Sequence, residues 1–143
     1  MIAYLDSSIV LRIILKQANP LAQWDELREG IGSPLLAVEC HRTLDRFWRE
    51  DRITDAEFEA KRSEMSAIVK HMGLVPLDER VLDAASQPMP TVVAALDAIH
   101  LVSAVLYRAS QPPDERPIYF ATHDKQLANA ARAMHFDVIG IPA

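Results

Sequence analysis

Short apolar segments alternate with longer amphipathic segments along this chain, and that alternation limits the fold more than any other feature. Five segments have the length and composition of buried strands, namely residues 2–5, 34–38, 73–77, 117–121 and 137–141. Strands separated by helices predict an α/β fold with a mainly parallel central sheet, because parallel neighbours need crossover connections and these are usually helical. Ligands of such sheets bind outside the carboxyl ends of the strands.

Helical patterns fill the intervals between these strands. Apolar spacing and capping residues predict helices over residues 9–15, 20–29, 38–49, 55–72, 79–87, 96–110 and 127–134. Thr54 and Glu57 form the capping-box pattern that starts the fourth of them. Its apolar stripe indicates a core or subunit contact and comprises Phe58, Met65, Ile68, Val69 and Met72. No interdomain linker is visible, and residues 1–143 are expected to form one domain.

Composition narrows the class of protein. No segment approaches the roughly 18 uncharged apolar residues of a membrane span. The N-terminal segment carries Asp6 and Arg12 and lacks the basic region and cleavage site of a signal peptide, so a cytoplasmic location is expected. Cys40 is the only cysteine, which excludes an intrachain disulfide and a thiolate zinc cluster.

The net charge of -5 argues against nucleic-acid binding through a broad basic surface. Any phosphate chemistry in this chain must therefore be local and assisted by a metal ion. Five basic residues follow acid-bearing segments and are candidates for phosphate contact, namely Arg12, Lys16, Arg42, Arg46 and Lys125.

Four carboxylates stand at or just beyond junctions between an apolar segment and a helical one, namely Asp6, Glu39, Asp97 and Asp124. If these junctions meet in space, the clustered charges need a divalent cation or large pKa shifts to coexist at neutral pH. Any single acid after a strand is more often the N-cap of the next helix, and Asp78 is the example of that simpler interpretation. Position alone does not separate a ligand from a cap.

Two of the four acids are harder to explain as caps. Glutamate is a poorer N-cap than aspartate, serine or asparagine, and Glu39 follows an apolar segment. Asp97 interrupts a run of apolar residues, where an uncompensated charge is costly. Hard divalent cations such as Mg²⁺ and Mn²⁺ take oxygen ligands of this kind.

The acid-bearing segments resemble those of a known family, the PIN-domain nucleases, and within it the VapC-type toxins of prokaryotic toxin-antitoxin pairs. Four segments carry the resemblance in the order the family has them, namely residues 3–8, 37–40, 96–104 and 121–127. The resemblance implies a PIN-like three-layer domain and a Mg²⁺- or Mn²⁺-dependent endoribonuclease that cleaves RNA. It also implies a homodimer and a small VapB-like antitoxin that covers the active site.

By this resemblance, three acids match the metal site of the family, namely Asp6, Glu39 and Asp97. Asp6 and Asp97 are expected to hold the main ion, and Glu39 to bind it or to orient the attacking water. Asp124 matches the fourth, more variable acid, which is expected to bind a second ion or to act through water.

The resemblance also concerns residues beside the acids. Ser7 and Thr122 match polar positions that usually support the acids by hydrogen bonding. His100 shares a helix face with the acid three residues before it, and a core or supporting role is expected because the family site is rich in oxygen. Two features depart from the pattern: His123 stands inside the last motif, and residues 134–136 lie where relatives commonly have a glycine.

Two other functions are compatible with clustered acids at a sheet edge. A receiver-like regulatory module also binds Mg²⁺ there, but it normally has an acidic pair after the first strand, whereas Asp6 is followed by two serines. A PIN-like domain without catalysis, which serves only for interaction, is the second alternative. Aspartyl phosphorylation by a small phosphodonor would favour the first, and a failure to bind metal would favour the second.

Overall fold

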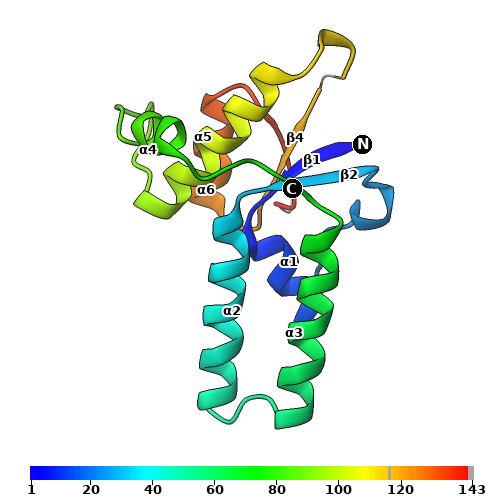
Figure 1. The fold of residues 1–143 in the computed structure, drawn as a ribbon. Coiled ribbons are helices and arrows are strands. Elements are labelled where there is room, and N and C mark those ends of the chain that lie inside the picture. The colour runs from blue at the N-terminus through cyan, green and yellow to red at the C-terminus, as the bar shows by residue number, and fades with distance from the viewer. Residues whose placement is uncertain (116, 142–143) are drawn as a thin grey trace.

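The computed structural model describes residues 1–115 and 117–141, and a five-stranded sheet lies at its centre (Figure 1). All paired strands run parallel, in the order β3-β2-β1-β4-β5. The strands are β1 (Ile2–Leu5), β2 (Glu29–Gly32), β3 (Gly73–Leu74), β4 (Tyr119–Ala121) and β5 (Asp137–Ile139). The predicted α/β class with a parallel central sheet is confirmed.

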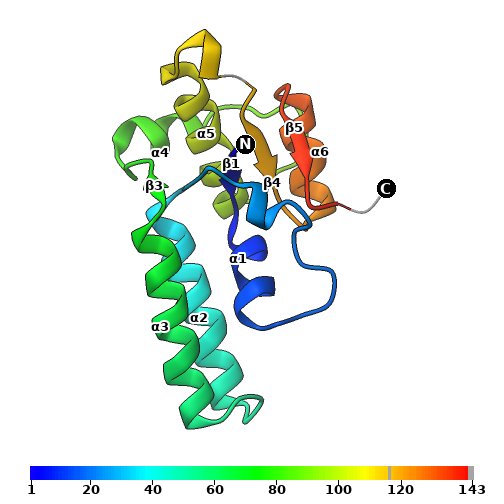
Figure 2. The ribbon, with the colours of Figure 1, turned by 90° about the vertical axis from the view of Figure 1, so that its right-hand side faces the viewer.

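Helices cover both faces of this sheet, which gives three layers (Figure 2). They are α1 (Ser7–Ile14), α2 (Pro34–Arg49), α3 (Asp55–Lys70), α4 (Glu79–Ala85), α5 (Ala95–Ser110) and α6 (Lys125–Ala133). Helices α5 and α6 pack on one face, and α1, α2 and α3 pack on the other. The long α2 and α3 lie side by side and project beyond the sheet in both views. In the described part of the chain, no helix is long and apolar enough to cross a membrane.

Strand β1 separates two clusters of the core because its side chains alternate between the faces of the sheet. Ile2 and Tyr4 belong to the cluster under α5 and α6, whereas Ala3 and Leu5 belong to the cluster under α1, α2 and α3. All four side chains are buried, as is typical of a strand covered on both faces. Asp6 is the first charged residue after the strand, and it stands at the carboxyl edge of the sheet.

The order of the strands reverses at that edge. The chain passes from the central β1 to β2 on one side and later to β4 on the other. Leu5 pairs with Ala121, so Asp6 and Thr122 leave the two strands as neighbours. A reversal of this kind in an open parallel sheet forms the crevice in which ligands bind.

Two predicted elements between α1 and α2 are wrong. Residues 20–29 form no helix, because Asn19 adopts a left-handed conformation (φ 56°) instead of the extended one of an N-cap, and the segment contains only the short 3₁₀ turn Trp24–Glu26. Residues 34–38 form no strand, because Ser33 and Pro34 supply the N-cap and first position of α2. The second strand is Glu29–Gly32, which pairing with β1 and β3 holds despite its two glycines.

The strand predicted at residues 2–5 has the expected ends, and the remaining predicted elements are present with one or both ends shifted. The strands predicted at residues 73–77, 117–121 and 137–141 are shorter than expected. The capping box at the start of α3 has both of its hydrogen bonds, between Thr54 and Glu57. The apolar stripe of α3 belongs to the core, since Met65 is buried and the other members pack against the cluster under α1, α2 and α3.

Candidate metal centre

Asp6 occupies the N-cap position of α1, yet its side chain makes no capping hydrogen bond. Its Oδ1 accepts a hydrogen bond from the Ser8 hydroxyl at 2.5 Å, and its Oδ2 accepts one from the Thr122 hydroxyl at 2.7 Å. Its backbone N–H donates to the Ala121 carbonyl at 3.2 Å, which joins the ends of β1 and β4. Asp6 is only 5% exposed. Its carboxylate is thus buried and oriented mainly by two hydroxyls, and its interaction with the backbone N–H of Ile9 in α1 is weaker than either of them.

The two hydroxyls also hold the loop after β4. Ser8 Oγ accepts from the backbone N–H of His123 at 3.0 Å, and Thr122 Oγ1 accepts from the backbone N–H of Asp124 at 3.0 Å. Each hydroxyl therefore has its proton directed to Asp6 and its lone pair occupied by the loop. Ser7 makes no hydrogen bond to Asp6 within the described residues, so the supporting role expected of it stays a prediction.

Glu39 lies in the second turn of α2 and is bound to a histidine of α5. Its Oε1 is 2.6 Å from His100 Nε2, and the Glu39 side chain is 20% exposed while that of His100 is 1% exposed. On the other side of the ring, His100 Nδ1 lies 2.9 Å from the hydroxyl of Tyr4. Tyr4 is fully buried in β1, two residues before Asp6. A chain of hydrogen bonds therefore joins Glu39 to β1, the strand that directly precedes Asp6.

Asp97 lies in the first turn of α5, where it is partly buried. Burial raises the pKa of its carboxyl group, and the negative charges of Asp124 and Asp6 raise this pKa further. Glu39 contributes in the same direction, whereas the protonated form of His100 would lower the pKa. The charges of the other three predicted acids thus all act on Asp97.

Asp6 has a raised pKa as well. The main cause is burial, and the hydrogen bonds from Ser8 and Thr122 offset part of it. A carboxylate whose ionised form is disfavoured in the folded chain gains from a nearby cation. This is the electrostatic condition that a metal site at the sheet edge would meet.

Asp124 is a true N-cap. Its Oδ1 accepts from the backbone N–H groups of Gln126, at 2.8 Å, and Leu127, at 3.1 Å. Its side chain is exposed, unlike that of Asp6, although its charge still acts on Asp97. One oxygen of Asp124 is thus committed to α6, so any contact with an ion falls to the other oxygen or to a bridging water.

The donor set fits a hard divalent cation. Among the described residues, no three His, Cys, Asp or Glu side chains are placed so that they ligate one ion together. The acids therefore surround the region without forming a closed cage. Mg²⁺ suits such an arrangement, because it usually keeps several waters and binds through one or two carboxylates plus a substrate phosphate. Asp6, Asp97 and Glu39 are the residues that would hold it.

Other reactive side chains near the acids have structural partners or are inert. Cys40 is buried beside Glu39, and burial raises the pKa of its thiol to about 12, so it remains protonated. His123 Nδ1 donates to the Gly140 carbonyl at 2.7 Å, which ties the last motif to the end of β5. A thiolate nucleophile is therefore not supported by Cys40, while His123 Nε2 is buried and has no hydrogen-bond partner among the described residues.

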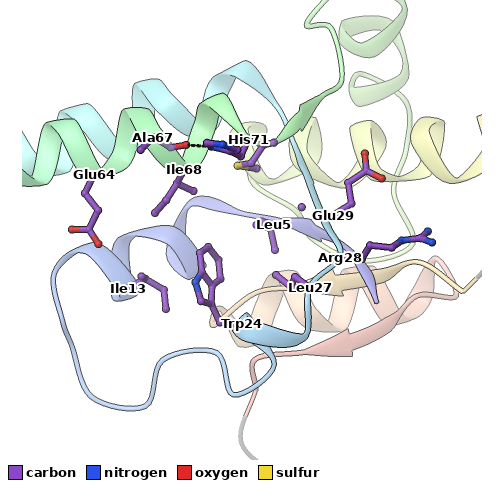
Figure 3. A pocket seen from close by; sticks show the side chains of 12 residues that line it. Leu5, Ile13, Trp24, Leu27, Arg28, Glu29, Glu64, Ala67, Ile68 and His71 are labelled. Carbon is purple, nitrogen blue, oxygen red and sulfur yellow. Dashed lines mark hydrogen bonds between the residues drawn. The ribbon is translucent and has the colours of Figure 1, made fainter.

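A separate pocket of about 500 Å³ opens between α1, α3 and the segment before β2 (Figure 3). Apolar side chains such as Trp24, Leu27 and Ile68 line it, together with the charged Glu64. Its lining reaches Leu5, the residue before Asp6, but includes none of the four acids. The ionisable side chains of this pocket, Arg28, Glu29, Glu64 and His71, match none of the family's acid positions, and the acidic edge remains the candidate centre.

Two residues that complete the centre were not identified from the sequence. The resemblance pointed to Ser7 as a support of Asp6, whereas Ser8 is the serine whose hydroxyl donates to the carboxylate. Tyr4 offered a signal, since a tyrosine in an otherwise apolar strand needs a partner for its hydroxyl. That signal did not identify the partner as His100.

Comparison with known proteins agrees with this geometry. The family model of the PIN domain matches residues 3–133, a range that contains the four acids and the side chains that support them. The chain is also similar to Ribonuclease VapC46 from Mycobacterium tuberculosis (strain ATCC 25618 / H37Rv), with 27% identity over 139 residues that cover 95% of each chain. With most of its length matched by the family model, the chain belongs to the PIN domain family.

Proposed function

We propose that this protein is a metal-dependent endoribonuclease that acts as the toxin of a toxin-antitoxin pair. The observation that carries the proposal is the state of Asp6, a buried carboxylate that two hydroxyls orient at the carboxyl edge of the sheet. The raised pKa of Asp97, caused partly by the charges of the other acids, supports a shared cation. Membership of the PIN family and a relative named as a ribonuclease support RNA cleavage.

The acids have separate roles in the proposed reaction. Asp6 and Asp97 hold the main ion, and Glu39, whose Oε1 is engaged by His100, offers Oε2 to the ion or to the attacking water. Asp124 acts through its second oxygen or through water. Bound Mg²⁺ or Mn²⁺ supplies Lewis-acid stabilisation of the phosphoryl charge and a lowered pKa for water. The hydroxyls of Ser8 and Thr122 keep Asp6 oriented while the substrate approaches.

RNA must approach an acidic protein, so local cations are part of the proposal. Arg42 and Arg46 follow Glu39 by three and seven residues on α2, which places them on the same side of the helix. Both are exposed, and Arg42 also pairs with Asp45 at 3.5 Å. Arg12 is the weaker candidate, since it donates to the Asn19 carbonyl at 3.2 Å. The two arginines of α2 are therefore the preferred phosphate contacts.

Exposed apolar side chains adjoin the acids and support a protein partner. Val38 precedes Glu39 and is 57% exposed, while Leu96 precedes Asp97 and is 48% exposed. Val92 is 83% exposed in the segment before α5. A VapB-like antitoxin that covers the acids would bury these three residues. A homodimer and a cytoplasmic location complete the proposal.

The experiment is cleavage of total cellular RNA by the purified chain. Mg²⁺ or Mn²⁺ should support cleavage, EDTA should abolish it, and the mapped ends should fall at a limited set of sites. The Asp97→Asn variant, with a circular dichroism spectrum like that of the wild type, should be inactive under the same conditions. Cleavage that persists in EDTA or in this variant would contradict the proposal.

The two alternative functions predict different results in simple assays. The family match sets aside a receiver-like module. A PIN-like domain used only for interaction would show no heat of binding in a titration with MnCl₂ and no cleavage of any RNA. For the toxin role, expression of the chain should arrest growth, and co-expression of a short protein encoded beside it should relieve the arrest.

A further inference from the structure

We infer that His100 is a positioning residue for Glu39 and that Tyr4 fixes the ring of His100 for this purpose. The inference rests on the proposed function, since it assigns the support of one of the proposed metal-site acids. His100 Nε2 is 2.6 Å from Glu39 Oε1, and Nδ1 is 2.9 Å from the Tyr4 hydroxyl. Both ring nitrogens are therefore used. With 1% exposure of the His100 side chain, water does not compete for either bond.

The chemistry of the three groups sets the direction of these bonds. An ionised carboxylate only accepts hydrogen bonds, so the proton between His100 and Glu39 belongs to Nε2. In a neutral imidazole, Nδ1 is then an acceptor, and the Tyr4 hydroxyl donates to it. We call this arrangement the Tyr4–His100–Glu39 relay. In this relay Tyr4 donates to His100, and His100 donates to Glu39.

The relay connects elements that carry the other acids. Tyr4 lies in β1 and Asp6 follows the end of that strand, while helix α5 carries both His100 and Asp97. A glutamate side chain has three rotatable bonds, and Glu39 comes from a third element, α2. The relay therefore fixes the most flexible of the three principal acids relative to the two elements that hold the others. With Oε1 engaged, Oε2 is left for the ion or the water.

A buried histidine that only fills the core is the competing explanation, and the two explanations differ in one respect. A positioning residue acts through Glu39, so its removal has no further effect once the Glu39 carboxylate is gone. A core residue acts on the whole fold, so its removal has the same effect with or without Glu39. A double-mutant cycle measures this difference.

The experiment measures Mn²⁺ affinity by calorimetry and cleavage of a quenched fluorescent single-stranded RNA of mixed sequence. His100→Leu should weaken both about 10- to 100-fold, as removal of an outer-shell partner typically does. His100→Gln should restore much of the loss, because its amide N–H replaces the Nε2 donor. In a Glu39→Ala background, His100→Leu should change Mn²⁺ affinity less than about twofold if the coupling is complete.

Controls separate the relay from loss of packing. Val102→Ala removes buried volume from the same helix without touching the relay, so it should lower the melting temperature and leave Mn²⁺ affinity unchanged. Tyr4→Phe keeps the ring in β1 and removes only the hydroxyl, so it should reproduce part of the His100→Leu loss. These variants keep the test valid even where His100→Leu folds poorly.

A second readout needs neither metal nor RNA. Long-range ¹H–¹⁵N NMR spectra of the metal-free wild-type chain should show a proton on His100 Nε2. The inference is overturned if His100 Nε2 carries no proton. It is also overturned if His100→Leu lowers Mn²⁺ affinity by the same factor in the Glu39→Ala background as in the wild type. If the wild type binds no Mn²⁺, the proposed function fails, and the NMR spectrum still decides the relay.

Discussion

Asp6 and Asp78 occupy the same place in the local sequence and are used in opposite ways. Each stands after a strand-forming segment, at the N-cap position of a helix. Asp78 Oδ1 accepts the backbone N–H of Val81 at 3.1 Å, so it caps α4, and it is exposed. Asp6 is buried, and its two oxygens accept from the hydroxyls of Ser8 and Thr122 instead.

The difference teaches that place in the sheet, and not local sequence, decides what such an acid does. Strand β3 lies at the edge of the sheet, whereas β1 is central and stands at the reversal of strand order. An N-cap hydrogen bond stabilises a helix by about 0.5–2 kcal/mol, and the Asp6 side chain makes only a weak interaction of this kind, with the backbone N–H of Ile9. Burial disfavours the charge of Asp6, and its hydrogen bonds offset only part of that cost. A charged group kept buried at a cost is typical of a functional site.

The sharpest test of this comparison replaces each acid by its amide. Asp6→Asn removes the charge of the proposed metal ligand, so metal-dependent RNA cleavage should be abolished. Asp78→Asn keeps an equally good N-cap and should cleave RNA like the wild type. Initial rates of cleavage at saturating Mg²⁺ measure both variants side by side. Full activity of Asp6→Asn, with its circular dichroism unchanged, would remove the distinction between the two junctions.

The next test concerns the hydroxyls that orient Asp6. Ser8→Ala and Thr122→Val each remove one hydrogen bond to the carboxylate, so each should reduce metal affinity and cleavage about 10- to 100-fold. Ser7→Ala is the matched control, because Ser7 makes no such bond in the described structure. Metal affinity and cleavage should fall far less in this variant. A titration with MnCl₂ supplies the affinities. Equal losses in Ser7→Ala and Ser8→Ala would contradict the assignment of Ser8.

Asp124 lies between the two extremes, because it caps α6 and also acts on the charge of Asp97. Asp124→Asn keeps the cap and removes the charge, so cleavage should fall about tenfold while stability is unchanged. Asp124→Ala removes both and should also lower the free energy of unfolding by about 1 kcal/mol. Urea denaturation and cleavage rates, measured on both variants, separate the two roles. An unchanged rate in Asp124→Asn would reduce this residue to a cap like Asp78.

Much of the site was predictable because the acids stand in short motifs whose order the family shares. Residues 3–8 and 96–104 alone located Asp6 and Asp97, and the spacing of His100 placed it on the same helix face as Asp97. What local patterns did not show were the bonds that cross the fold. The Thr122 hydroxyl reaches Asp6 across 116 positions of the chain, and His100 reaches Tyr4 across 96.

The fold class was predictable because short apolar segments alternate with amphipathic ones. The prediction of single elements failed where tertiary pairing overrode local preference. Residues 29–32 contain two glycines and a glutamate, which disfavour a strand, yet pairing on both sides makes them β2. The apolar residues 34–38 have strand-like composition, but Ser33 and Pro34 begin a helix. The helix that starts there brings Glu39 to the site from the side of the sheet, and not from a strand end.

The pH dependence of stability tests the electrostatic part of the comparison. The pKa of Asp6 and of Asp97 is raised from 3.8 in the folded chain, so the folded state retains protons that the unfolded chain releases. Their contribution to the stability of the metal-free chain is present below pH 3.8 and is lost as pH rises through the raised values. Chemical denaturation in EDTA should therefore show a smaller decline with rising pH for Asp6→Asn than for the wild type. Saturating Mn²⁺ should also reduce the wild-type decline, because the ion binds the ionised form. Identical pH profiles for both chains would contradict the burial of a titrating Asp6.

The smallest effect is expected at Asp78, where the comparison predicts a change in stability alone. Asp78→Ala removes the acceptor of the Val81 N–H, so the free energy of unfolding should fall by about 1 kcal/mol. Although α4 packs on α5, which carries Asp97, a loss confined to the cap should leave the position of Asp97 and the rate of cleavage unchanged. Asp78→Ser, which restores a capping oxygen, should recover most of the stability. A loss of cleavage in Asp78→Ala that Asp78→Ser does not recover would show that Asp78 takes part in the site, and the two junctions would then no longer differ in kind.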